Sequence, residues 1–147
     1  MPPTPLDACS RQALEDHFRA SQPGPDPRGL FEGRFLCWVD GPPPSMRLVD
    51  TLLFRALRFG VDFDRGVWWF VRPRVTVGRF RSSRGPSRWR EAEVLRLEYD
   101  VSRLPPPLRT MLYDEVKPLT EDLCLGLGGV NAPNGRGAHF FFALARR

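Results

Sequence analysis

The sequence predicts a mainly β protein: a closed or nearly closed antiparallel barrel, with an N-terminal helix and a second short helix after the first strand. Three observations support this fold class. Apolar or alternating segments follow one another from residue 67 to residue 145. Turns rich in glycine and proline separate them, and short connections join antiparallel neighbours. The last segment, 140–144, is so apolar that barrel closure is needed to hide it from solvent.

The chain has 147 residues, which is the length of one domain. We expect a single domain over 1–147, with a helix over 5–20, a linker over 22–29 and the barrel over 30–147. Thr4 and Asp7 have the spacing of a capping box, which favours a helix start at this point. The proline-rich linker then ends the helix.

The first strand is expected over residues 30–39, with Phe31, Gly33, Phe35, Cys37 and Val39 on one face. A second helix is expected over 46–59, because Ser45 can cap it and Gly60 can end it.

The later strands are predicted from period-two alternation and from turn residues. In residues 91–101 the alternation is clearest, with Leu95, Leu97 and Tyr99 on one face and Arg96 on the other. Residues 82–86 are expected to form a loop, and the three prolines at 105–107 to exclude a helix. An Asn-Gly pair within 131–137 predicts a hairpin turn. The strands are expected over 67–71, 74–81, 91–101, 109–117, 123–130 and 138–145.

Charge and cysteine content narrow the function classes. The net charge is +5, and Lys117 is the only basic residue that is not arginine. The arginines are scattered, which favours a compositional origin over a nucleic-acid surface and argues against nucleic acid as a partner. Three isolated cysteines fit a reducing compartment, and we expect a cytoplasmic protein. No apolar run reaches the length of a membrane span.

No motif for metal, nucleotide or nucleophilic chemistry is present, so we expect no metal and no cofactor. The glycines in 125–130 lack the spacing of a dinucleotide site and the lysine of a phosphate loop. Asp114 and Glu115 are adjacent on a predicted strand, so their side chains must point to opposite faces. They therefore cannot form a catalytic carboxylate pair.

The aromatic content is the most informative feature, with four tryptophans and eleven phenylalanines. These side chains exceed what a tight core of this size can hold, which predicts an aromatic-lined cavity. Polar side chains on the same strands would orient a ligand. The candidate ligand-binding residues are Trp68, Arg96, Tyr99, Tyr113, Asp114 and His139.

The C-terminal part of the chain, residues 95–145, carries four segments in a characteristic order. They are Leu95–Asp100, Tyr113–Lys117, Leu123–Gly126 and Phe140–Leu144. This arrangement resembles bacterial β-barrel proteins of lipocalin-like (calycin) type. The resemblance implies a barrel fold and a broad ligand-holding role, without an activity to carry over.

The leading functional hypothesis is a barrel that binds an apolar or amphipathic small molecule, such as a lipid, a fatty acid or a polyketide-like metabolite. The alternative is a cyclase, isomerase or hydratase that uses His139 or Asp114 as its proton carrier. A nucleic-acid-binding barrel is a third, weaker hypothesis. Non-enzymatic binding is favoured over catalysis, and a homodimer is compatible with the sequence.

Overall fold

The computed structural model describes residues 4–20, 22–40, 51–52, 55–103, 105–130 and 138–147. Nine strands form one antiparallel sheet in the order β4-β3-β2-β1-β9-β8-β7-β6-β5. The strands are β1 (Leu30–Asp40), β2 (Phe59–Asp62), β3 (Val67–Phe70), β4 (Arg72–Arg79), β5 (Arg81–Pro86), β6 (Glu93–Glu98), β7 (Leu112–Pro118), β8 (Leu123–Val130) and β9 (Ala138–Arg146).

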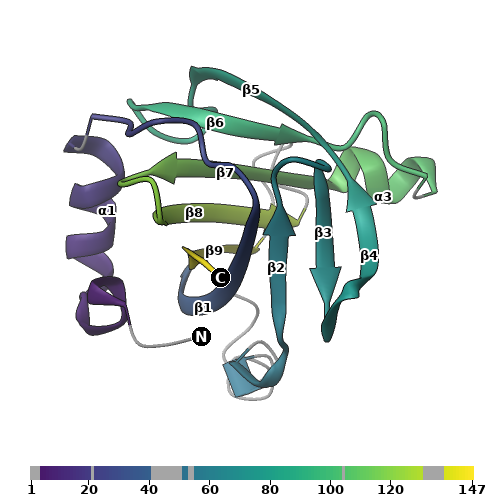
Figure 1. Cartoon of the computed structure of the whole chain (residues 1–147). Helices are drawn as coiled ribbons and strands as arrows, with labels where there is room; N and C mark the ends of the chain where they lie inside the picture. Colours follow the sequence, from purple (N-terminus) through teal and green to yellow (C-terminus); the bar gives the residue numbers. More distant parts are fainter. Residues whose placement is uncertain (1–3, 21, 41–50, 53–54, 104, 131–137) are drawn as a thin grey trace.

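The sheet curls into a nearly closed barrel (Figure 1), as the sequence predicts. Each strand except β5 pairs with the strand that precedes it along the chain, and the first strand, β1, also pairs with the last, β9. The two strands left at the edges are β4 and β5, which follow one another through Phe80. One bent segment therefore carries both edges of the sheet. The barrel stays open between these two edge strands, β4 and β5, and we call this opening the seam.

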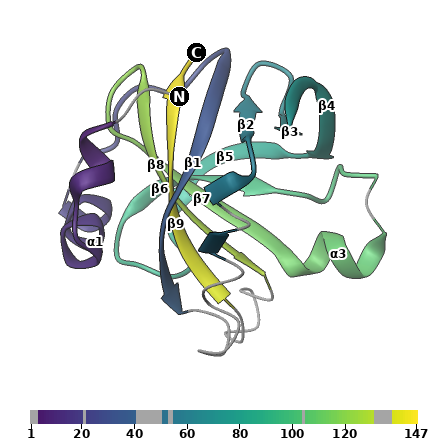
Figure 2. The ribbon, with the colours of Figure 1, turned by 90° about the horizontal axis from the view of Figure 1, so that it is seen from below.

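The N-terminal helical segment covers the outer face of the barrel beside β8 and β9 (Figure 2). It consists of a 3-10 turn, η1 (Pro5–Ala8), and a helix, α1 (Arg11–Ala20), in place of the single helix expected over 5–20. The predicted cap is confirmed, because the Asp7 carboxylate accepts hydrogen bonds from the Thr4 backbone N–H at 2.5 Å and from its hydroxyl at 2.9 Å. Phe18 of α1 packs on Phe141 with ring centroids 5.9 Å apart.

Two apolar clusters form on the two sides of the sheet. The inner cluster fills the barrel and includes Phe59, Trp68, Tyr99 and Phe142. The outer cluster joins α1 to the sheet through Leu14, Phe18, Leu127 and Phe141. The predicted alternation in β6 is confirmed, because Leu95, Leu97 and Tyr99 are all inside while Val94 is outside.

Strand β1 departs from the predicted alternation. Its pairing with β9 shifts register between Phe35 and Cys37 and again between Trp38 and Asp40. Because of the first shift, Cys37 and Val39 join the outer cluster while Phe31 and Phe35 stay on the inner side. The prediction that these four residues share a face was therefore wrong, since a bulge reverses the alternation.

Three other predictions about elements need correction. Residues 82–86 were expected as a loop, but they form β5, which pairs with β6 over six residue pairs. The prolines at 105–107 do not exclude a helix, because α3 (Pro106–Met111) begins among them, where a first turn needs no N–H donor. Strand β7 consequently starts at Leu112 instead of Arg109.

The second predicted helix lies largely outside the described residues. Of its span, 51–52 and 55–56 are helical. Its predicted end at Phe59 and Gly60 was wrong, because both residues belong to β2. The predicted hairpin turn at 131–137 also lies outside the described residues.

Candidate functional site

A buried polar pair lies inside the barrel at the end that faces α3. Tyr99, which follows β6, donates its hydroxyl hydrogen to Oδ2 of Asp114 on β7. Tyr99 is 4% exposed and Asp114 is partly buried. The neighbouring Glu115 points to the other face of β7, as the sequence predicts for adjacent strand residues.

The surroundings of this pair favour the protonated forms of both side chains. Burial raises the pKa of Asp114 to about 7, against the opposing effect of its hydrogen bond from Tyr99, and the Glu115 charge raises it further. The pKa of Tyr99 is raised well above its ordinary value, first by burial and then by the Asp114 charge. A carboxyl group with a pKa near neutrality can give up or accept a proton at physiological pH.

Trp68 of β3 contributes a third polar group to this place. Its indole Nε1 is buried and forms no hydrogen bond of normal geometry with a described residue. The N–H is close enough to the Tyr99 hydroxyl to lower the pKa of that tyrosine. A buried donor without an acceptor is costly in a folded protein. Trp68 therefore supplies a buried, incompletely satisfied hydrogen-bond donor beside the Tyr99–Asp114 pair.

Aromatic rings surround these polar groups. The Trp68 ring lies 5.7 Å from Phe142 and 6.0 Å from Phe59, and Phe140 lies 5.9 Å from Phe142. These rings meet edge-on or tilted and pack against one another. The predicted aromatic-lined cavity stays a prediction.

A hollow of about 730 Å³ opens at the seam, between β4 and the segment that follows β6. We call it the seam hollow, and its walls include Val67, Val77, Gly78, Arg79, Val101 and Arg103. Gly78 has a φ of +78°, and a Cβ atom there would lie 3.6 Å from the ring of Tyr99 and 3.9 Å from that of Trp68. The backbone at Gly78 is therefore a thin wall between the hollow and the buried polar groups.

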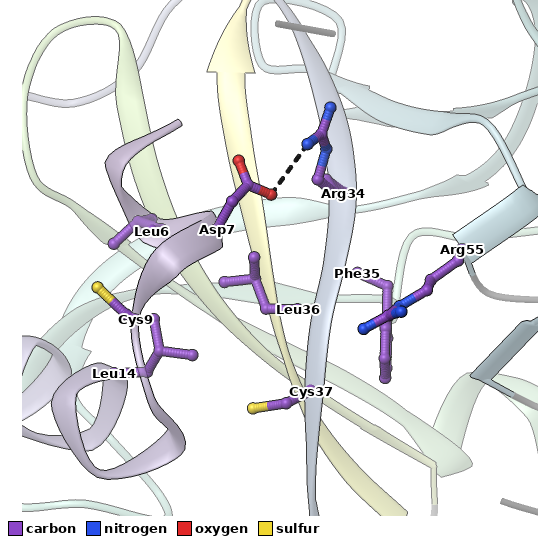
Figure 3. A pocket seen from close by; sticks show the side chains of 9 residues that line it. All are labelled: Leu6, Asp7, Cys9, Leu14, Arg34, Phe35, Leu36, Cys37 and Arg55. Carbon is purple, nitrogen blue, oxygen red and sulfur yellow. Dashed lines mark hydrogen bonds and ion pairs between the residues drawn. The ribbon is translucent and has the colours of Figure 1, made fainter. Parts of the chain in front are cut away.

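A second hollow, of about 310 Å³, lies where η1 and α1 meet β1 (Figure 3). Asp7 and Arg34 form an ion pair of 3.0 Å at its rim. In Figure 3, Cys37 points toward the helical segment and Phe35 points to the other side of β1, as the bulge requires. This hollow lies between the helical segment and the barrel, and none of the candidate residues lines it.

The remaining predicted residues lie on the outer face of the sheet. Arg96 donates from Nε to the carbonyl oxygen of Pro86 at 2.8 Å, which ties β6 to the end of β5. Tyr113 donates to Glu115 at 2.9 Å, and the Arg88 guanidinium lies 4.1 Å from the centroid of the Tyr113 ring. Burial, followed by the Glu115 charge, raises the pKa of the Tyr113 hydroxyl.

Glu115 is fully buried and organises this outer group. Its carboxylate accepts hydrogen bonds from the Ser87 hydroxyl and, at 2.6 Å, from the Arg88 backbone N–H. With Tyr113, three donors satisfy one buried carboxylate, which is how a buried acid is normally accommodated. The arrangement anchors the segment between β5 and β6, so it has a structural explanation.

His139 belongs to the same outer side. Its ring centroid lies 4.8 Å from that of Trp89, and its Nδ1 lies 3.4 Å from Oδ2 of Asp40. Its Nε2 is buried without a hydrogen-bond partner among the described residues. His139 and Asp114, the two predicted proton carriers, are thus on opposite sides of the sheet. Of the two, Asp114 is the one beside the interior donors.

The structure therefore divides the six predicted residues into two groups. Trp68, Tyr99 and Asp114 come together inside the barrel, whereas Arg96, Tyr113 and His139 lie outside. Sequence reasoning missed the glycine at the seam, although an isolated glycine in a strand can mark a close approach of another group. It also missed Arg79 and Arg103, because nothing in their local sequence separates them from the other arginines.

In the described parts of the chain, no three His, Cys, Asp or Glu side chains gather in a way that could hold a metal ion. The helices described there are all too short or too polar to cross a membrane. The three cysteines are free thiols, and burial raises the pKa of Cys124 to about 12.

Comparisons with known proteins bear on the fold. No family model and no curated protein matches the chain. Among solved structures, the crystal structure of a protein from Thermomonospora curvata matches with a TM-score of 0.54 and 17% sequence identity. The match covers 95% of this chain and 88% of that one. At this identity the similarity concerns the fold alone: the two chains share a similar overall arrangement of strands.

Proposed function

We propose that this barrel, of lipocalin-like type, binds a small apolar or amphipathic molecule at the seam. The observation that carries the proposal is the buried, incompletely satisfied N–H of Trp68 beside the Tyr99–Asp114 pair. A ligand oxygen that accepts this hydrogen bond would remove the cost of the unsatisfied donor. The seam hollow, at about 730 Å³, lies within the size range of small-molecule sites.

The ligand that fits these features has an apolar body and a hydrogen-bond acceptor at one end. Valines in the hollow offer apolar contact, and the Trp68 donor lies directly behind the Gly78 backbone. An alkyl ketone is the simplest molecule with this chemistry. Its oxygen would lie near Asp114. This carboxyl group is largely protonated below neutral pH, and in that form it can donate a hydrogen bond to the ligand oxygen.

Binding is tested with the neutral dye Nile red, displaced by 2-decanone. We expect saturable binding to the wild-type protein. In Trp68→Phe, which keeps an aromatic ring and removes the N–H, we expect 2-decanone to bind about five- to tenfold more weakly, the worth of one buried hydrogen bond. His139→Ala is the matched control, because it removes a ring on the outer face. Equal affinity in wild type and Trp68→Phe would contradict the proposed role of the indole.

A second candidate function is catalysis by proton transfer, and the pKa of Asp114 favours it. A carboxyl group with a pKa of about 7, hydrogen-bonded to Tyr99 and beside an apolar hollow, has the properties of a general acid or base. An isomerase or hydratase would need little more than this group and a shaped site.

If the barrel is such an enzyme, Asp114→Asn should lower turnover by about a hundredfold or more while substrate affinity changes little. The wild-type rate should change with an apparent pKa near 7. Rates are measured over pH 5–9 on oxygenated alkyl substrates that displace Nile red. A loss of affinity in Asp114→Asn without any turnover in wild type would leave binding as the function.

A further inference from the structure

The seam hollow contains two arginines that pair with no described acidic side chain. Arg79 on β4 and Arg103 after β6 are exposed, and neither forms an ion pair within the described ranges. Arg65, also in the hollow, lies 3.9 Å from Asp62, which is at the limit of an ion pair. Asp64 is the acidic residue among the lining residues, so the arginines outnumber it.

Two arginines of the neighbouring hollow are paired, while a third, Arg109, forms no ion pair with a described residue. Beside α3, where a hollow of about 550 Å³ is lined by Arg81 and Arg88, Arg81 lies 2.6 Å from Asp100 and Arg88 lies 3.5 Å from Glu98. Arg79 and Arg103 are therefore exposed cationic groups at the seam hollow that are available to bind an anion. Guanidinium groups bind carboxylates strongly, often through two parallel hydrogen bonds.

Apolar side chains accompany these charges. Val77 is 45% exposed and Val101 is 44% exposed, although they face a hollow that could bury them. Val67 lies on the same wall. Exposed valines next to unpaired arginines form an amphipathic surface, and its natural ligand has an apolar chain and an anionic end.

We propose that the seam hollow binds the carboxylate end of a medium-chain oxygenated acid, held by Arg79 and Arg103. The alkyl chain lies on the valines, with its far end at Gly78. This inference rests on the proposed function and adds the charge of the ligand to it. The proposed ligand is a single acid molecule in solution. A protein that bound only to vesicles of anionic lipid would overturn the inference.

The test compares two ligands, 9-oxodecanoate and 2-decanone, by displacement of Nile red. Both have a ten-carbon chain that ends in a methyl ketone, and only the first has a carboxylate. We expect wild type to bind the acid at least about tenfold more tightly. In Arg79→Gln/Arg103→Gln the preference should fall to about threefold or less. The matched control, Arg72→Gln/Arg74→Gln, removes two exposed arginines of the same strand that lie outside the hollow and should keep the preference.

Salt dependence in wild type gives a second readout that needs no variant. Raising sodium chloride from 20 to 200 mM should weaken binding of 9-oxodecanoate and leave 2-decanone unchanged, because screening acts on the charged end. Equal affinity of the two ligands, absence of this salt effect, or equal loss of preference in both double variants would overturn the inference while the proposed function stands. If neither ligand displaces the dye, the proposed function fails, and this inference fails with it.

Discussion

Asp114→Asn should stabilise the protein at pH 8 by about 2–4 kcal/mol and have little effect at pH 4. The folded-state pKa of Asp114 is raised from 3.8 to about 7, so the unfolded chain loses this proton first as the pH rises. Ionisation of the unfolded state lowers the stability of wild type progressively between about pH 4 and pH 7, and above pH 7 the cost is constant. Asparagine stays neutral and can still accept the Tyr99 hydrogen bond.

Chemical denaturation of both proteins at pH 4, 5, 6, 7 and 8 measures this difference, in which the titration of all other groups cancels. A difference that stays constant over the series would show that Asp114 is not perturbed. Tyr99→Phe provides a further check. It removes the hydrogen bond that holds the Asp114 pKa down, so the fall in stability should extend to higher pH.

Gly60→Ala should lower the stability by about 3 kcal/mol or more, the largest loss that we expect from adding a single methyl group. Gly60 lies on β2, opposite Glu32 of β1. A Cβ atom there would lie 2.1 Å from the carbonyl oxygen of Phe31 and 2.4 Å from Cζ2 of Trp69. Neither group can yield easily, because the Trp69 indole N–H donates to that same carbonyl oxygen at 3.2 Å.

Gly85→Ala is the matched control for Gly60→Ala. A Cβ atom at Gly85 would meet the Arg96 guanidinium at 2.8 Å, which is the mobile end of a flexible side chain. We expect a loss below about 1 kcal/mol in this variant. Thermal melts followed by circular dichroism should show a fall in Tm of roughly 10 °C for Gly60→Ala and a few degrees at most for Gly85→Ala. Similar melts for the two variants would contradict this account of the β1–β2 contact.

Period-two alternation predicts the face on which each side chain lies where a strand is regular, and it fails where the strand is not. In β6 it correctly assigned Leu95, Leu97 and Tyr99 to one face, because period-two geometry is a property of the backbone. In β1 it failed after Phe35, since a bulge depends on the partner strand and leaves no mark in local sequence. The helix at Pro106 was missed because proline breaks a helix interior but suits its first turn.

The candidate site was predictable to a similar extent. The same alternation that assigns Tyr99 to the interior places Arg96 on the opposite face, and the same argument separates Tyr113 from Asp114. Both separations could have been drawn from the sequence. The approach of Trp68 to Tyr99 and Asp114 could not, because β3 lies far from the neighbouring strands β6 and β7 in the sheet order and only the curvature of the sheet brings it to them.

The pairing of β1 with β9 has a consequence for the order in which the protein is made. All other pairings join strands that follow one another along the chain, so hairpins can form soon after their residues leave the ribosome. β1 obtains β2 as a partner early, but its other edge must wait until β9, near the C-terminus, has been synthesised. During that interval Phe31 and Phe35 lack their final neighbours, and the nascent chain exposes an unpaired strand edge.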